Sequence, residues 1–246
     1  MGETELRIGT AGWSIPLKNA EGFPSEGTSL ERYSARFRCA EINSSFHRPH
    51  RPATYERWAS AVPEDFRFSV KMPKTITHQQ RLVESEGLVD AFLLEITGLG
   101  SKAALLLVQL PPSFAFDADV AAAFFGHLRA STAAKLACEP RHAGWFEAEA
   151  DALLDSHEVA RVAADPAKVE AAAQPGGWRG LTYYRLHGSP IVYRSSYDDG
   201  RLETYSAAIQ ADRSERREVW CIFDNTASSA GAGDALRLQE ILGHAP

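Results

Sequence analysis

The stretch Ala104-Leu105-Leu106-Leu107-Val108-Gln109-Leu110, followed by Pro111-Pro112, decides the fold class of this sequence. Its apolar residues form a continuous run instead of alternating with polar residues, which is typical of a strand buried on both faces of a parallel sheet. Other short apolar runs lie on both sides of it. The eight predicted strands cover residues 6–9, 39–43, 66–72, 104–110, 135–140, 159–165, 182–187 and 219–224.

Segments with helical periodicity separate these strands. Leu88, Phe92 and Ile96, for example, recur at the spacing of one buried helical face. Alternation of strands and helices predicts a parallel sheet covered by helices, and the length of 246 residues is close to the roughly 250 residues of a (β/α)8 barrel. We therefore expect an α/β fold, a (β/α)8 TIM barrel, that forms a single domain over residues 1–246.

Composition argues against several classes of partner. The net charge of −6 does not favour a nucleic acid or an anionic membrane, and no apolar run approaches the roughly 18 residues of a transmembrane helix. The N-terminal residues do not resemble a signal peptide. The three cysteines lie far apart in apolar segments, as expected for buried thiols in a reducing compartment. We expect a cytoplasmic protein with no membrane partner.

Polar or ionisable side chains stand at the carboxyl ends of most predicted strands, where barrels carry their active sites. Residues two apart in a strand lie on the same face, so three strands each carry a polar pair on one side. The pairs are Glu41 with Asn43, Glu139 with Arg141, and Arg185 with His187. The other candidates at these ends are Lys71, Gln109, His142, Trp145, Asp224 and Asn225.

These residue types favour an enzyme, a hydrolase or an isomerase, that acts on an anionic or sugar-phosphate-like substrate by acid/base chemistry. Guanidinium groups match the geometry of carboxylate and phosphate, so Arg141, Arg185 and Lys71 are the expected anion-binding residues. The expected proton carriers are Glu139, His187 and Glu41. Further ligand contacts are expected from Asn43, His142, Trp145, Gln109 and Asn225.

Structural roles compete with these assignments. Arg185 and Glu139 are as well suited to a structural ion pair that closes the top of the barrel, and His187 before Gly188 to a satisfied turn. Gln109 and the two asparagines are equally suited to bonding the backbone.

Two other enzyme classes remain open. One is a metal-dependent hydrolase or phosphodiesterase with a divalent ion, whose ligands would be Glu41, Glu139, His142, His187 and Asp224. The sequence contains no His-Glu-x-x-His motif, and the nearby arginines would repel a cation. The other is a glycosidase that uses Glu41 and Glu139 as its carboxylate pair.

A non-catalytic binding protein, including a nucleic-acid binder, is the alternative outside the enzymes. Aromatic side chains beside basic residues can stack on unpaired bases. The candidates are Trp13, Phe46, Trp145, Tyr193 and Tyr197. The overall acidity argues against this alternative.

Six motifs occur in order along the chain, and together they resemble the YecE-like family, domain of unknown function 72. They are Gly9-Thr10-Ala11-Gly12-Trp13, Glu41-Ile42-Asn43-Ser44-Ser45-Phe46, Lys71-Met72-Pro73-Lys74 with Thr77-His78, Gln109-Leu110-Pro111-Pro112-Ser113-Phe114, Glu139-Pro140-Arg141-His142 with Trp145, and Tyr184-Arg185-Leu186-His187-Gly188. The resemblance implies a (β/α)8 barrel related in shape to sugar isomerase and endonuclease barrels, and it implies no particular reaction. His47 and Asp224 depart from the Tyr and Asn of the family pattern, and both add a titratable group near the expected site.

Overall fold

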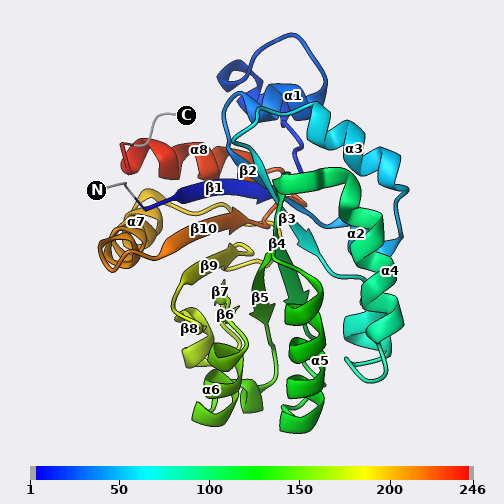
Figure 1. The fold of residues 1–246 in the computed structure, drawn as a ribbon. Coiled ribbons are helices and arrows are strands. Elements are labelled where there is room, and N and C mark those ends of the chain that lie inside the picture. The colour runs from blue at the N-terminus through cyan, green and yellow to red at the C-terminus, as the bar shows by residue number, and fades with distance from the viewer. Residues whose placement is uncertain (1–3, 244–246) are drawn as a thin grey trace.

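A ring of parallel strands occupies the middle of the molecule, with the helices outside it (Figure 1). The computed structural model describes residues 4–243. Around the ring the strands follow the order β9-β10-β1-β2-β3-β4-β5-β6, and β7 pairs with the free edge of β9. Their bounds are β1 (Leu6–Ala11), β2 (Cys39–Ile42), β3 (Arg67–Lys71), β4 (Ala103–Gln109), β5 (Lys135–Glu139), β6 (Val159–Arg161), β7 (Ala163–Asp165), β9 (Leu181–Leu186) and β10 (Glu218–Phe223). The predicted α/β barrel is confirmed.

The strand predicted at 159–165 is two short strands that close the ring. Its first part, β6, pairs with β5, and its second part, β7, pairs with β9. The change of partner occurs at Val162, whose amide still donates to the Cys138 carbonyl at 2.8 Å. The very short β8 (Gly176–Gly177) adds an antiparallel edge to β6.

Helices cover most of the outer surface of the ring (Figure 1). The α-helices are α1 (Ser29–Ser34), α2 (Ser44–His47), α3 (Pro52–Ser60), α4 (Glu86–Ile96), α5 (Ala118–Ser131), α6 (Ala148–Ser156), α7 (Asp199–Ser214) and α8 (Gly231–Ile241). Shorter helical turns are η1 (Leu17–Gly22), η2 (Thr75–Gln79), η3 (Thr97–Lys102), η4 (Ala143–Phe146) and η5 (Glu170–Ala173). Between β7 and β9 the 3-10 turn η5 stands where the regular barrel pattern would place an α-helix. Among the helices of residues 4–243, none is long and apolar enough to cross a membrane.

The surroundings of strand β4 explain why apolar and polar residues do not alternate in its sequence. Leu105 and Leu107 pack inside the ring, in a core that also contains Tyr183 and Trp220. Leu106 and Val108 belong to the larger core between the ring and the helices. Both faces of β4 are therefore buried, as its continuous apolar run predicts.

Strands β1 and β2 lie close together at Gly9. A Cβ atom at this position would lie 2.3 Å from the carbonyl oxygen of Cys39 and 2.9 Å from its Sγ. Gly9 and Cys39 are partners in the β1–β2 ladder, so the Cys39 backbone cannot move away without disturbing the pairing of the strands. A side chain at position 9 would therefore force the two strands apart.

We expect Gly9→Ala to lower the free energy of unfolding by about 1–3 kcal/mol, the usual cost of overpacking a core. Gly87→Ala in α4 is the matched control, because a Cβ there meets no atom within 4 Å. Replacing a helical glycine with alanine should instead stabilise the protein by about 0.4–1 kcal/mol. Urea unfolding of both variants measures the difference, and equal midpoints would contradict the close approach of β1 and β2.

Candidate functional site

The guanidinium group of Arg185 lies at the centre of the carboxyl-end layer inside the barrel. Arg185 extends from β9 and is 1% exposed. Its nitrogens contact three carboxylates: Glu41 of β2 at 2.7 Å, Glu139 of β5 at 2.8 Å, and Asp224, the residue after β10, at 3.0 Å. Burial disfavours the charged guanidinium, but the carboxylates outweigh this effect and raise the pKa of Arg185 further above its ordinary value. The site is thus organised around one buried cation.

Glu41 is held from two sides. Both of its carboxylate oxygens accept from Arg185 Nε, at 3.2 and 3.1 Å. The Tyr183 hydroxyl donates to the same carboxylate at 2.7 Å and lies 3.0 Å from Ser69 Oγ. Glu41 is also fully buried. These contacts give Glu41 a positioning role for Arg185 and leave no free oxygen facing a ligand.

His187 lies between two carboxylates at the end of β9. Its Nδ1 is 3.0 Å from Asp224 Oδ2, and its Nε2 is 3.3 Å from Glu139 Oε1. The second contact lacks hydrogen-bond geometry, so Nε2 is a buried polar atom without a hydrogen-bond partner in the described chain. Burial opposes protonation of this ring, but Glu139 and Asp224 together raise the pKa of His187 above its ordinary 6.5.

A pocket of about 220 Å³ opens beside His187 and Glu139. Its polar wall includes Arg141, which binds Glu139 Oε1 at 2.9 Å and lies 3.5 Å from the Tyr193 hydroxyl. Tyr193 belongs to the segment between β9 and α7, and its ring packs edge-on against His187 at 5.5 Å. The remaining lining residues are Pro140, Ala164, Pro166, Lys168, Ala172 and Val192. The pocket therefore joins an apolar wall to an imidazole and a guanidinium.

Lys71 occupies the inner face at the end of β3. Its Nζ lies 4.2 Å from the centre of the Phe46 ring, a cation–π contact. The Phe46 ring is itself held edge-on by His47 and His78, each with centroids 5.0 Å away. Burial and then the positive charge of Arg185 lower the pKa of Lys71 to about 8, although the nearby carboxylates oppose this change.

The remaining predicted residues divide into two groups. Asn43 reaches Asp224 at 3.5 Å, and Gln109 is buried at the end of β4, where the alternation of that strand places it on the inner face. Trp145, His142 and Asn225 make structural contacts instead. Trp145 is fully buried and donates to the Phe114 carbonyl at 3.0 Å, and His142 Nδ1 accepts from the Gly144 amide at 3.1 Å. Asn225 donates to Ser195 at 2.9 Å and to Asp234 at 2.6 Å.

The arrangement of donors does not fit a metal ion. Within residues 4–243 no group of three or more His, Cys, Asp or Glu side chains has a geometry that could hold one. Glu41, Glu139 and Asp224 converge on the Arg185 guanidinium, which occupies the position an ion would need. The same guanidinium binds both Glu41 and Glu139, the two carboxylates of the glycosidase alternative.

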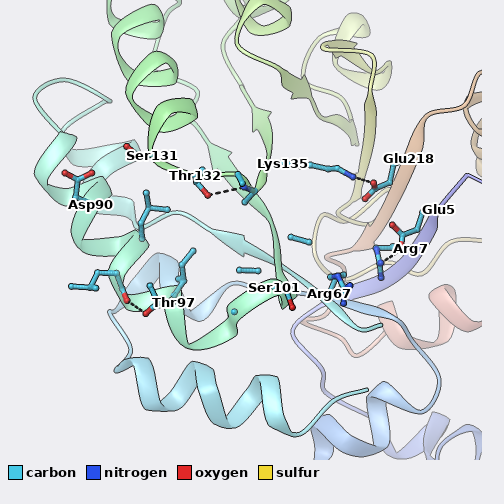
Figure 2. A pocket seen from close by; sticks show the side chains of 18 residues that line it. Glu5, Arg7, Arg67, Asp90, Thr97, Ser101, Ser131, Thr132, Lys135 and Glu218 are labelled. Atoms are coloured by element: carbon cyan, nitrogen blue, oxygen red, sulfur yellow. Dashed lines mark hydrogen bonds and ion pairs between the residues drawn. The ribbon is translucent and has the colours of Figure 1, made fainter. Parts of the chain in front are cut away.

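A second pocket, of about 810 Å³, opens at the opposite, N-terminal end of the strands (Figure 2). Four of its charged side chains are paired with one another: Lys135 contacts Glu218, and Arg7 contacts Glu5 (Figure 2). Barrel enzymes carry their chemistry at the other end, where the loops after the strands meet. The smaller pocket beside His187 is therefore the candidate site.

Sequence reasoning missed three residues that the structure brings to this region. Tyr183 lies two residues before Arg185, so strand alternation alone could have placed it on the inner face. Tyr193 appeared only as a stacking candidate, and Lys168 carried no signal. Both line the pocket from irregular segments, whose course no sequence period specifies.

Known proteins resemble the chain along its length. A 22% identical relative is the UPF0759 protein YunF of Bacillus subtilis, matched over 96% of this chain and 94% of that protein. The UPF0759 protein YecE of Escherichia coli is 36% identical over 109 residues, which span 44% of this chain and only 39% of YecE.

Solved structures show the same fold. A DUF72 family protein from Enterococcus faecalis superposes with a TM-score of 0.80 at 20% identity, covering 97% of this chain and 95% of that one. A DUF72 family protein from Thermotoga maritima gives a TM-score of 0.77 at 23% identity, covering 97% and 99%. The model of the family described as "Protein of unknown function DUF72" matches residues 7–246. The chain therefore belongs to the DUF72 family.

Proposed function

We propose that this protein is an enzyme that binds a small anionic substrate, such as a sugar phosphate or a carboxylic acid, in the pocket beside His187 and transfers a proton to or from it. The observation that carries the proposal is the placement of the imidazole. Its Nδ1 is oriented by Asp224 at 3.0 Å, and its buried Nε2 lies 3.3 Å from Glu139 Oε1 without making a hydrogen bond in the described chain, although His187 lines the pocket. A buried polar atom without a partner is costly, so a ligand group that bonds Nε2 would be stabilising.

The protonation state of His187 fits a general acid. Two carboxylates raise its pKa, so the ring keeps its proton closer to neutral pH than a free histidine does. An acid is most effective when its pKa lies near the working pH. Glu139 takes a different part: Arg185 and His187 outweigh its burial and hold its pKa well below the usual range. Glu139 thus stays ionised and positions the cations around it.

Net charge favours an anion in the pocket. Three buried carboxylates face Arg185, Arg141, Lys71 and a protonated His187, so the cations outnumber the carboxylates by one. In this low-dielectric environment an unbalanced positive charge attracts an anion more strongly than it would in water. Arg141 is the cation best placed for direct contact, because it lines the pocket and remains partly exposed.

The structure lends less support to a nucleic-acid binder. Trp145 and Tyr197 are buried, and Trp13 packs against Trp58 with ring centroids 5.1 Å apart. Few of the candidate aromatic faces are thus free for stacking. We also propose a cytoplasmic location, because the three cysteines are unpaired and buried, as expected in a reducing compartment.

We expect His187→Gln and Arg141→Met each to weaken the binding of inorganic phosphate about tenfold or more. Each change removes a charge-assisted hydrogen bond, which contributes about 1.5–3 kcal/mol. Isothermal titration calorimetry measures the affinities, and Arg51→Met, at an exposed site before α3, is the control. Unchanged phosphate affinity in both site variants would contradict the proposed anion pocket.

Phosphate affinity should also fall as the pH rises. The folded-state pKa of His187 lies above 6.5, so its cationic form and the affinity it supports are fully present below pH 6.5. They are lost as the pH passes the folded-state pKa. Besides Asp224, the groups that act on this ring are Glu139, Arg185 and the Tyr193 ring.

Asp224→Asn should move the loss of phosphate affinity to lower pH, because it removes one carboxylate that stabilises the imidazolium. Calorimetry across the pH range and NMR titration of the His187 ring measure the shift. Asp199→Asn removes an exposed carboxylate paired with Arg237, and it should leave the titration unchanged. A His187 ring that titrates identically with and without the Asp224 carboxylate would show that Asp224 does not set its protonation.

A further inference from the structure

We propose that Lys71 is a nucleophile and forms a Schiff base with the carbonyl carbon of a substrate that also carries an anionic group, such as a keto acid or a phosphorylated aldehyde. This inference rests on the proposed function, because the same site must hold the anion. It adds a covalent step and narrows the substrate class to carbonyl compounds.

The position of Lys71 suits this role. It stands on the inner face at the C-terminal end of β3, where the charges of Arg185, Glu41, Glu139 and Asp224 all act on it. Ser45 Oγ donates to the backbone carbonyl of Lys71 at 2.6 Å and so fixes the end of the strand. The residue keeps 8% of its surface exposed.

The contacts of its ammonium group distinguish Lys71 from a lysine with a structural role. Its contact in the described chain is the Phe46 ring, and no described carboxylate lies within ion-pair distance of its Nζ. Lys102 is also 8% exposed, but its Nζ donates to the carbonyls of Ala59 and Val62 at 2.8 and 2.9 Å. The two carbonyl acceptors stabilise the charged ammonium of Lys102, whereas the ammonium of Lys71 donates to no oxygen atom in the described chain and therefore loses its proton at less cost.

Lysine must be unprotonated to attack a carbonyl group. Its ordinary pKa is about 10.4, and the value of about 8 for Lys71 raises the neutral fraction near pH 7 by about two orders of magnitude. The neutral Nζ adds to the carbonyl carbon, and the carbonyl oxygen takes up a proton. The resulting carbinolamine loses this oxygen as water. In balance, one ammonium and one carbonyl group give one protonated imine and one water.

The test is reductive trapping of the whole protein with glyoxylate and sodium cyanoborohydride at neutral pH. Cyanoborohydride reduces the imine to a stable carboxymethyl amine, which peptide mass spectrometry locates and quantifies. We expect the Lys71 peptide to be modified at least about tenfold faster than the peptides of Lys102 and of exposed Lys74, since a tenfold change corresponds to one pKa unit. This comparison is internal to the wild-type protein, so it does not depend on the folding of a variant.

Two variants sharpen the result. Lys71→Arg keeps the charge over Phe46 but should abolish the fast modification, and Lys74→Arg should leave it intact. Modification of Lys71 no faster than of Lys74 and Lys102 would overturn the Schiff-base inference. Phosphate titration of the same wild-type sample separates the two proposals. If phosphate still perturbs the His187 ring while Lys71 stays unmodified, only the Schiff base is wrong; if neither occurs, the proposed function falls as well.

Discussion

The buried guanidinium of Arg185 is the constraint on which the rest of the site depends. Its carboxylate partners come from β2, from β5 and from the residue after β10, while Arg185 itself comes from β9. The Arg185 guanidinium therefore connects distant parts of the ring through its ion pairs. Burying charged groups costs desolvation free energy. Ion pairs offset this cost only when their geometry is nearly ideal and the remaining donors and acceptors are hydrogen-bonded. Three buried carboxylates would lose their shared counter-charge without Arg185, so the inner layer at this end of the barrel has little freedom to rearrange.

This constraint separates scaffold from working groups. The Glu41 carboxylate accepts hydrogen bonds from Arg185 and Tyr183. The Glu139 carboxylate contacts Arg185, Arg141 and His187. What remains available is at the rim, where His187 and Arg141 line the pocket. The charged residues at the strand ends thus fall into two groups: Glu41 and Glu139 hold the Arg185 guanidinium, and His187 and Arg141 line the pocket. A rigid inner layer of this kind keeps a reactive side chain within the small tolerance that catalysis requires.

Strand alternation explains both what could be predicted and what could not. It placed Glu139 with Arg141 and Arg185 with His187, and the structure joins all four in one cluster. The continuous apolar run of β4 likewise identified a strand buried on both faces. The break at Val162 has no such signal, because the change of pairing partner is decided by the closure of the ring and not by local pattern. The structural contacts of Trp145, His142 and Asn225 depend on loop paths, which residue spacing does not specify.

Neighbouring groups with opposed pKa shifts give the site its chemical character. The pKa of His187 is raised from 6.5 and that of Lys71 is lowered from 10.5 to about 8, so both move toward neutrality from opposite sides. Arg185 and the carboxylates act on both residues. At His187 the two contacting carboxylates outweigh burial, whereas at Lys71, which contacts no carboxylate directly, burial dominates. Environments that push pKa values in opposite directions assign an acid and a base within one site. One buried cluster can in this way hold a protonated imidazole and a partly neutral amine at the same pH.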